Sequence, residues 1–369
     1  MQIIYRQTWA EVSLVSLSKN FQSLRNIIPV YTKVMACVKA DAYGHGLVQV
    51  AQKLAQEEVE YFGVASIDEG VKLRQSGIKV PILILGLVLN KDILPLFDFK
   101  LTPTVSSLDF ARALNKVAIK RKQNLCVHIK IDTGMGRIGF LPEEAKKAII
   151  VMHQFKTLFI EGLFTHLACA DINRSFTLQQ LEAFNKVVRQ LALVGVRIPL
   201  LHAANSMGVM GYKESHFNMV RPGLALYGLS PRATLKVKLE PVLSLKSKVV
   251  YTKKLPAGYG LSYGHDYVTK HNTNIVTIPI GYGDGYPRNL SNIAPVLIGG
   301  KRFKVSGRVC MDQLLVDVGK NNIKAGSEVV LIGKQGKNSV TVDELAKLSQ
   351  TISYEIVCGL GSRIPRVYI

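Results

Sequence analysis

The sequence predicts an α/β protein that begins with a (β/α)8 TIM barrel and ends with a mostly antiparallel β domain. Short apolar runs alternate with amphipathic segments up to about residue 235, and helical periodicity nearly disappears beyond that point. A chain of 369 residues also exceeds the size of one typical hydrophobic core. We therefore expect a barrel domain over residues 1–235 and a β domain over residues 236–369.

Eight runs of apolar and β-branched residues are the predicted barrel strands. They are Val34–Ala40, Tyr61–Ser66, Pro81–Leu85, Leu101–Val105, Leu125–Ile131, Ile160–His166, Ile198–His202 and Met219–Tyr227. The amphipathic stretches between them include Leu47–Glu57, Asp68–Ser76, Ser107–Lys120, Pro142–Phe155 and Thr177–Val194. Eight βα units in about 200 residues favour a closed barrel. The alternative is an open doubly wound sheet, but no GxGxxG motif follows the first strand.

The second half of the chain has short strand-like runs separated by Gly, Pro and Asn. These runs are Leu243–Lys253, Asn274–Ile280, Pro295–Ile298, Phe303–Val309, Leu314–Val318 and Glu328–Ile332. Only Val342–Ser349 has clear helical periodicity. This texture predicts a mostly antiparallel β domain.

Composition and charge exclude several classes of protein. The net charge of +21 favours anionic partners, but Lys and Arg are spread along the chain, so we expect no nucleic-acid binding. The longest apolar runs, such as Pro81–Leu89, are too short to cross a bilayer. Arg6 and Glu11 interrupt any N-terminal signal sequence. Five scattered cysteines without CxxC spacing indicate a reducing cytoplasm.

Lys39 closes the first predicted strand, within ACVKADAYGHG at residues 36–46. Barrel enzymes keep their chemistry at the C-terminal ends of the strands. Loss of water there lowers the pKa of an amine and makes it nucleophilic, as a Schiff-base lysine requires. A lysine that only extends into water is the structural alternative. The adjacent turn, which contains Tyr43 and two glycines, favours the functional interpretation.

Two further strand ends carry basic side chains. HIKIDTGMGRIGF at residues 128–140 places glycines on both sides of Met135, so the backbone can bend before Arg137. The sixth strand ends at His166. A surface arginine and a structural histidine are the alternatives, and their common position at strand ends favours a site.

The last two barrel loops are predicted to bind phosphate. They contain HAANSMG at residues 202–208 and VRPGLALYG at residues 220–228. Loops after the last two strands of a barrel commonly bind phosphate through backbone N–H groups and small hydroxyls. Ser206 and Gly223 suit that role, and Arg221 could face the phosphate or a ring nitrogen.

The β domain has three motifs rich in Gly, Tyr and Asp: GYGLSYGHDY (258–267), IGYGDGYPR (280–288) and GRVCMDQ (307–313). Hairpin turns with packed rings would also produce such motifs. We expect no metal site, because neither HExxH nor a compact group of His, Asp and Glu is present. A GxSxG nucleophile elbow is absent as well.

Taken together, the motifs resemble those of the alanine racemases. The resemblance is carried in order by VKADAYGHG, IDTGMGRIGF, THLACAD, HAANS, RPGLALYG, SYG, GYGDG, GRVCMDQ and TISYE, and it covers nearly the whole chain. It implies an isomerase that uses pyridoxal 5′-phosphate (PLP) to interconvert L-alanine and D-alanine. It further implies a supply of D-alanine for peptidoglycan precursors, and a head-to-tail homodimer with shared active sites.

The resemblance assigns the catalytic roles. Lys39 would hold PLP covalently, and Lys39 and Tyr263 would be the two bases acting on the external aldimine of PLP and alanine. Arg221 would face the pyridine nitrogen with His202 supporting it. His166 would connect this charge to Tyr263.

The other matching residues would bind the cofactor or the substrate. The phosphate would be held by Tyr43, Ser206, Gly223 and Tyr354. Arg137 would contact the phenolic oxygen of the cofactor and the substrate carboxylate. Met311 and Asp312 of the partner subunit would line the substrate pocket. Lys130 matches a position that is carbamylated in some members of the family.

The chemistry of racemisation explains these residue types. A proton leaves Cα on one face and returns on the other, so two bases are needed. Neither an amine nor a phenol has an ordinary pKa near neutrality, and burial or neighbouring cations must lower both. PLP supplies the electron sink. An arginine at its ring nitrogen disfavours protonation there, which suppresses transamination and decarboxylation.

Four other functions are alternatives to an alanine racemase. A PLP decarboxylase of the same architecture is expected to have an acidic residue near the ring nitrogen, where this chain has Arg221. A second alternative is a racemase for serine or for a broader set of amino acids, and the broad-spectrum members tend to carry a signal peptide and disulfides, which this chain is expected to lack. Non-catalytic PLP carriers are single barrels. A nucleic-acid binder would show a steep dependence of affinity on salt.

Overall fold

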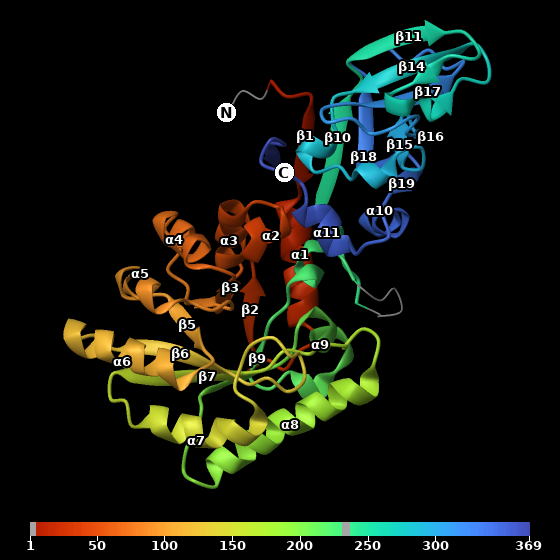
Figure 1. Ribbon diagram of the computed structural model, residues 1–369. Helices are drawn as coiled ribbons and strands as arrows, with labels where there is room; N and C mark the ends of the chain where they lie inside the picture. Colours follow the sequence, from red (N-terminus) through yellow and green to blue (C-terminus); the bar gives the residue numbers. More distant parts are fainter. Residues whose placement is uncertain (1–4, 231–236) are drawn as a thin grey trace. The chain divides into compact units, whose positions relative to one another are not determined.

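A computed structural model describes residues 5–230 and 237–369 and divides into two compact units (Figure 1). The barrel unit comprises Leu17–Ala42 and Leu47–Glu240. The sheet unit combines the chain up to Ser16, the short stretch Tyr43–Gly46 and Pro241–Ile369.

Eight parallel strands close the barrel, and each strand coincides with or overlaps one predicted run. They are β2 (Lys33–Cys37), β3 (Tyr61–Val64), β4 (Ile82–Ile84), β5 (Thr102–Val105), β6 (Leu125–Lys130), β7 (Leu158–Phe164), β8 (Leu200–His202) and β9 (Met219–Val220). β9 returns to β2, with Met219 opposite Lys33, and this pairing closes the ring. The predicted barrel is confirmed.

Helices surround these strands in Figure 1, as apolar strands with both faces covered require. They are α1 (Leu14–Arg25), α3 (Leu47–Gln56), α4 (Ile67–Gln75), α5 (Leu94–Asp98), α6 (Leu108–Arg121), α7 (Pro142–His153), α8 (Arg174–Ala192) and α9 (Ser206–Gly211). Side-chain caps mark several starts: Asn173 accepts from the N–H of Phe176 at 3.0 Å and begins α8. The same helix buries Leu181, Phe184 and Leu191, one stripe of an amphipathic helix.

Two predicted strands end earlier than the sequence indicated. β2 stops at Cys37, and the backbone after Lys39 turns into a left-handed conformation. β9 contains only Met219 and Val220, and a short 3-10 turn over Leu224–Tyr227 follows. In both places the chain leaves the barrel where the predicted site residues lie.

The sheet unit is mostly antiparallel, as predicted. Its largest sheet has the order β16-β15-β18-β10-β1-β20, with β19 on β18, and the smaller sheets are β11-β14-β17 and β12-β13. The strands are β1 (Thr8–Val12), β10 (Leu243–Lys248), β11 (Tyr251–Leu255), β12 (Gly260–Leu261), β13 (Tyr267–Val268), β14 (Thr273–Ile278), β15 (Pro295–Ile298), β16 (Lys301–Lys304), β17 (Leu314–Gly319), β18 (Glu328–Gln335), β19 (Asn338–Val340) and β20 (Arg366–Tyr368). Two short helices, α10 (Val342–Leu348) and α11 (Ser353–Cys358), complete the unit.

The first strand of the chain lies in this sheet and not in the barrel. β1 pairs antiparallel with β10, with Thr8 opposite Ser247 and Val12 opposite Leu243. The hydroxyls of Thr8 and Ser247 are hydrogen bonded at 2.7 Å. The division into domains 1–235 and 236–369 stays a prediction. β1 falls within the first of these ranges but pairs with a strand of the sheet unit.

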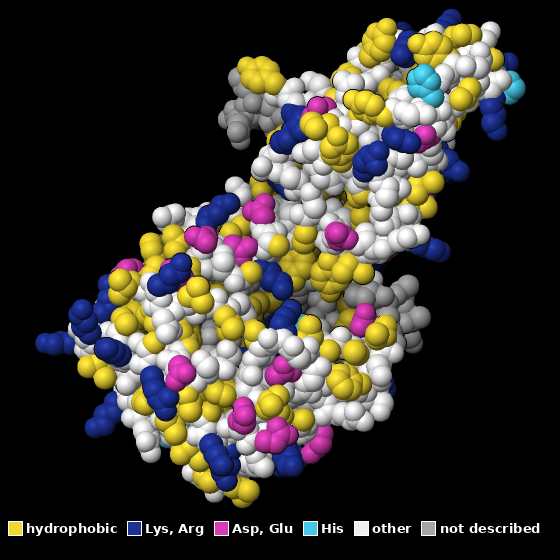
Figure 2. Space-filling view, in the orientation of Figure 1, with side chains coloured by type: hydrophobic (Ala, Val, Ile, Leu, Met, Phe, Trp, Pro, Cys, Tyr) yellow, Lys and Arg dark blue, Asp and Glu magenta, His cyan; other side chains and the backbone are white. Residues whose placement is uncertain are grey.

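Charge is dispersed on the surface. On the face of the barrel unit that Figure 2 shows, Lys and Arg side chains alternate with acidic and apolar ones and form no continuous patch. Among the helices in residues 5–230 and 237–369, none has both the length and the apolar character that a membrane span requires.

Candidate active site

The predicted basic residues of the barrel unit follow the C-terminal ends of its strands. His202 is the last residue of β8, His166 follows β7 by two positions, and Arg221 comes directly after β9. The C-terminal ends of parallel barrel strands meet on one rim. Electrostatics agrees: burial lowers the pKa of His166 most, and the charges of Arg221, Lys130, Arg137 and Lys39 lower it further.

The turn that carries Lys39 is strained and held from two sides. Ala40, Asp41, Ala42 and Tyr43 have φ between 53° and 54°, a left-handed conformation that costs a non-glycine residue about 1–2 kcal/mol. Glu69 accepts a hydrogen bond from the N–H of Ala40 at 2.6 Å. Asp41 accepts one from the N–H of Leu47 at 2.9 Å. Such strain persists only where the surroundings impose it, and it is common at functional sites.

Arg221 is a buried cation whose partners are all neutral. Its Nη1 donates to Nδ1 of His202 at 2.8 Å, and its Nη2 donates to the carbonyls of Thr165 and Ala203 at 2.7 and 3.1 Å. Burial lowers the pKa of Arg221 to about 10, so the guanidinium remains charged near neutral pH. Over the described ranges no carboxylate pairs with it, which leaves its charge available to an anion.

Lys130, the last residue of β6, is buried beside this cation. Its ammonium lies over the ring of Phe164, 4.4 Å from the centroid, and the same ring stacks on His202. Burial, and then the charges of Arg221 and Arg137, hold the pKa of Lys130 well below its ordinary value.

Asp132 shapes the loop that carries Arg137, a role that the sequence analysis did not assign. Its carboxylate accepts the N–H groups of Gly134, Met135, Gly136 and Arg137 at 2.8–3.1 Å. Burial alone would raise the pKa of Asp132, but these hydrogen bonds hold it below its ordinary value. An aspartate followed by Gly-rich sequence is a typical turn signal that could have revealed this.

Ser206 and Gly223, the predicted phosphate ligands, are directly connected. The Ser206 hydroxyl accepts from the N–H of Gly223 at 3.0 Å and from that of Ala225 at 3.2 Å. With both lone pairs engaged, the hydroxyl hydrogen of Ser206 is left to donate to another group. The structure therefore brings Ser206, Gly223 and Arg221 together at the ends of β8 and β9.

In the sheet unit, two predicted residues lie on adjoining loops. Tyr263 begins a 3-10 turn and exposes 70% of its surface, and Met311 exposes 53%. The loops adjoin because the Ser262 hydroxyl donates to the carbonyl of Arg308 at 2.7 Å and contacts Sγ of Cys310 at 3.4 Å. Large side chains so exposed are suited to meet a ligand or a partner.

Three more predicted residues, Asp312, Tyr43 and Tyr354, lie in the sheet unit. Asp312 forms an ion pair, and the rings of Tyr43 and Tyr354 contact each other. Arg363 Nη2 lies 2.6 Å from Oδ1 of Asp312. The rings of Tyr43 and Tyr354 are 5.9 Å apart at their centroids. A Cβ on Gly44 would come within 2.1 Å of the carbonyl oxygen of Val357 in α11, so only glycine allows this approach.

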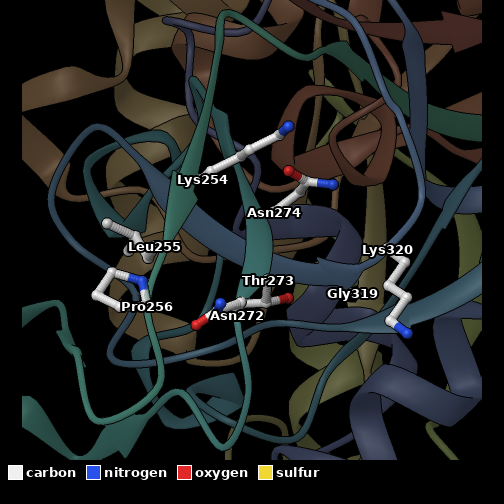
Figure 3. A pocket seen from close by; sticks show the side chains of 8 residues that line it. All are labelled: Lys254, Leu255, Pro256, Asn272, Thr273, Asn274, Gly319 and Lys320. Carbon is white, nitrogen blue, oxygen red and sulfur yellow. The ribbon is translucent and has the colours of Figure 1, made fainter.

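The sheet unit also has a hollow that contains none of the predicted residues. It measures about 440 Å³ and lies where β11, β14 and β17 meet (Figure 3). Lys254, Asn274 and Lys320 border it with polar side chains. Since no predicted chemistry falls there, the candidate site is confined to the loops described above.

Sequence profiles of one family match almost the whole chain. The profile described as "Alanine racemase, N-terminal domain" matches residues 12–231, and "Alanine racemase, C-terminal domain" matches residues 242–368.

Individual proteins are similar over the same length. Curated alanine racemases of Halothermothrix orenii and Carboxydothermus hydrogenoformans are each 44% identical over 369 residues, which is 99% of this chain and 97% and 100% of theirs. A solved alanine racemase of Clostridium difficile 630 superposes with a TM-score of 0.96 at 40% identity, covering 100% of this chain and 97% of that one. A histidine racemase of Leuconostoc mesenteroides superposes at 0.93 with 29% identity, covering 100% and 99%.

Proposed function

The chain belongs to the alanine racemase family, and from that premise we propose that it interconverts L-alanine and D-alanine with PLP as cofactor and Lys39 and Tyr263 as its two bases. As a member of this family it is an isomerase. A solved alanine racemase of Bacillus anthracis, 36% identical with a TM-score of 0.94 over 100% of this chain and 96% of that one, is described with bound L-Ala-P. That description supports an alanine-like ligand for this chain as well.

Arg221 is the observation that carries the proposal. It is a buried guanidinium with neutral partners, next to Lys130, at the rim where Lys39 emerges. A buried cation that, within residues 5–230 and 237–369, pairs with no carboxylate favours an anionic ligand. The phosphate, the phenolic oxygen and the carboxylate of an amino acid bound with PLP are such anions.

The donor groups fit PLP, whose bound form supplies an electron sink for the charge left at Cα. The residues that would hold it are Lys39 through its amine, Arg221 and Arg137 through their guanidinium groups, and Tyr43, Ser206, Gly223 and Tyr354 around the phosphate. The Ser206 hydroxyl has a hydrogen to donate, which supports its assignment to the phosphate.

The two bases divide the work by face. Lys39 would hold or release a proton at Nζ on one side of Cα, and the Tyr263 phenol would do so on the other. His202 is neutral, since burial and then the charge of Arg221 hold its pKa well below the ordinary value. His166 is neutral for the same two reasons, and we propose that it relays the field of Arg221 toward Tyr263.

Arg221 would also set reaction specificity. A carboxylate at that position would accept a hydrogen bond from the protonated ring nitrogen and favour its charged form, as a decarboxylase of this architecture is expected to do. A guanidinium has no acceptor and repels a positive ring. Side reactions that need a long-lived negative charge at Cα are thereby disfavoured.

We extend the proposal to a carbamate on Lys130. Its buried amine has a lowered pKa, so Nζ can attack the carbon of CO2 and lose one N–H proton to solvent. The resulting anion would offset the charges of Arg221 and Arg137 and orient Arg137. Carbon-13 NMR of protein in labelled bicarbonate would show a carbamate signal that Lys130→Met removes and Lys120→Met, at an exposed position, retains. No such signal in the wild-type protein would contradict this assignment.

We also propose a head-to-tail homodimer in which Tyr263, Met311 and Asp312 complete the site of the partner. The exposure of Tyr263 and Met311 on adjoining loops supports a covered surface. The five cysteines are all free, which is compatible with a cytoplasmic enzyme that supplies D-alanine for peptidoglycan precursors. The dispersed charge of Figure 2 does not suggest a nucleic-acid partner.

A chiral chromatographic assay tests the activity. Purified protein reconstituted with PLP is incubated separately with L-alanine and with L-serine, and each D-enantiomer is followed with time. We expect D-alanine to form until L-alanine and D-alanine are present in equal amounts. D-serine is expected to form more slowly. Lys39→Ala is expected to abolish both. Faster racemisation of serine, or release of an amine and CO2 in place of D-alanine, would refute the proposed substrate or reaction.

A further inference from the structure

A row of hydrogen-bonded side chains crosses the interior of the barrel below Arg221. Nη1 of Arg221 lies 2.8 Å from Nδ1 of His202, and Nε2 of His202 lies 2.8 Å from Nδ1 of His128. Nε2 of His128 lies 3.3 Å from Oε2 of Glu161, to which the Tyr61 hydroxyl also donates at 2.6 Å. Both histidines are fully buried. The row therefore joins the rim that carries Arg221 to the opposite end of the barrel, where Tyr61 begins β3.

The donors and acceptors of this row can be arranged in only one way while Arg221 is charged. A guanidinium only donates, so Nδ1 of His202 must accept and its hydrogen must sit on Nε2. That hydrogen points at Nδ1 of His128, which must then accept, and the hydrogen of His128 must sit on Nε2. The last donor ends on the carboxylate of Glu161. Both rings are thus neutral and carry their hydrogen on Nε2.

The charges of these groups agree with that arrangement. Burial lowers the pKa of His128, although the hydrogen bond to Glu161 opposes the shift. Burial lowers the pKa of His202 further, with the charge of Arg221 as the next cause. Burial alone would raise the pKa of Glu161, but the hydrogen bonds from His128 and Tyr61 bring it below the ordinary value. The carboxylate is the acceptor that terminates the row.

The barrel wall is adapted to hold His128 in this row. Gly162 on β7 faces the imidazole, and a Cβ at that position would lie 2.3 Å from Nδ1 of His128. The pairing of β6 with β7 shifts register between Val127 and His128, directly beside this contact. Gly162 and the register shift between β6 and β7 together leave room for the imidazole ring of His128.

We propose that Glu161 is a positioning residue for Arg221: through the fixed tautomers of His128 and His202 it keeps the guanidinium bonded and correctly aimed from the far end of the barrel. This inference rests on the proposed function, because it concerns how Arg221 meets the cofactor. Glu161 balances the buried charge of Arg221 without placing a carboxylate next to it. A nearby carboxylate would neutralise the effect of Arg221 on the ring nitrogen.

Removal of the terminal acceptor is expected to free the tautomers. In Glu161→Leu the Nε2 hydrogen of His128 has no acceptor, so the ring gains by moving that hydrogen to Nδ1. Nε2 of His202 must then accept, and its own hydrogen would move to Nδ1 and face the N–H of Arg221. Two donors cannot share that contact, so Arg221 must shift. Glu161→Gln keeps an acceptor oxygen for His128 and Tyr61 and is expected to retain the wild-type tautomers.

Nitrogen-15 NMR of the full-length protein, labelled at its eight histidines, reads the tautomers directly. In the wild type we expect His128 and His202 to be neutral with the hydrogen on Nε2 between about pH 6 and pH 8. A cationic ring, or a hydrogen on Nδ1 of His202 in the wild type, would overturn the proposal even if no variant folds. Glu161→Leu is expected to give a second set of signals for both rings. Glu182→Leu, at an exposed position of α8, is the matched control.

Reaction specificity provides the second readout. In the PLP-loaded Glu161→Leu variant we expect pyruvate formed per racemisation turnover to rise roughly fivefold, the factor that one lost hydrogen bond of ordinary strength represents. A folded Glu161→Leu variant with unchanged tautomers and an unchanged pyruvate ratio would reduce Glu161 to a packing residue. A wild-type protein that forms no D-alanine would refute the proposed function alone, since the tautomers are measured without turnover.

Discussion

Tyr263 is a phenol on the surface of the sheet unit, and its proposed role depends on one hydroxyl. Its ring exposes 70% of its surface, so no packing argument within that unit requires a tyrosine there. Phenylalanine would preserve the ring and remove only the group that exchanges a proton. The substitution therefore separates chemistry from structure at a single oxygen atom.

For Tyr263→Phe we expect the exchange of the α-proton of L-alanine in heavy water to fall by about 10²–10⁴, the usual contribution of one general base. Exchange from D-alanine is expected to fall much less, because Lys39 serves that face. Proton NMR of each enantiomer measures both rates. Tyr259→Phe, in the same Gly-rich segment and also exposed, is the control. An equal loss of only a few-fold for both enantiomers would mean that Tyr263 is not a base.

The turn after Lys39 has a strained backbone, which lowers the stability of the fold. Four consecutive residues, 40–43, are left-handed, and the carboxylates of Glu69 and Asp41 are among the groups that hold the turn. Ala40 is exposed, so its methyl group contributes little packing. Its left-handed backbone costs about 1–2 kcal/mol, against about 0.5–1 kcal/mol of added chain entropy for glycine.

Ala40→Gly is therefore expected to raise the free energy of unfolding by up to about 1 kcal/mol. Urea unfolding followed by circular dichroism measures the change. Ala113→Gly, within the helix α6, is the matched control and is expected to lower stability by about 1 kcal/mol. If both substitutions destabilised the protein alike, the turn would not be strained in solution.

At the scale of the whole molecule, buried histidines connect stability to pH. Burial lowers the pKa of His128, His166 and His202 in the folded barrel. Between the folded pKa and the unfolded value of about 6.5, the unfolded chain binds more protons. The contribution of these histidines to stability is thus complete above about pH 6.5 and is lost as pH falls, by up to about 1.4 kcal/mol per pH unit for each histidine. The lowered pKa of Glu161 adds a second loss only below its ordinary value of about 4.3.

The urea midpoint of the helical signal, measured between about pH 8 and pH 5, tests this linkage. We expect the decline of the midpoint to become steeper below about pH 6.5. His166→Gln is expected to make the decline shallower, and His153→Gln, at an exposed position, is expected to leave the curve unchanged. A midpoint that stays constant through this range would show that the three rings become protonated without unfolding the barrel.

The proposed dimer predicts complementation between two inactive proteins. If each site combines Lys39 of one chain with Tyr263 of the other, a hybrid of Lys39→Ala and Tyr263→Ala chains has one site with both lesions and one with none. About half of randomly exchanged dimers are hybrids, so activity is expected to recover to about a quarter of wild type. Chiral chromatography measures the recovery, and native mass spectrometry confirms the exchange. Confirmed exchange without recovery would place both residues in the same chain's site.

Much of the fold could be read from local patterns. The eight barrel runs are apolar on both faces and alternate with amphipathic stretches, and this arrangement has few solutions other than a closed parallel barrel. Lys39 and His166 are predicted site residues because polar groups that end such strands gather on one rim, whereas the role of His202 was implied by the family resemblance. Local patterns were not sufficient where pairing with other strands sets the ends of a strand. The single run predicted over Leu243–Lys253 is two strands, β10 and β11, and each pairs in a different sheet.

The sequence by itself determined the fold class, the family and the residues that carry the proposed chemistry, since these depend on periodicity and on motifs a few residues long. Only the tertiary structure decided that β1 lies in the sheet unit, that Asp132 gathers four N–H groups, and that His128 and Glu161 continue the row below Arg221. Each of these is a contact between positions whose own sequence context is ordinary. A histidine inside a strand has the same local pattern whether it meets a glycine or a valine across the barrel wall. The register of eight strands, set by all their neighbours together, decides which it meets.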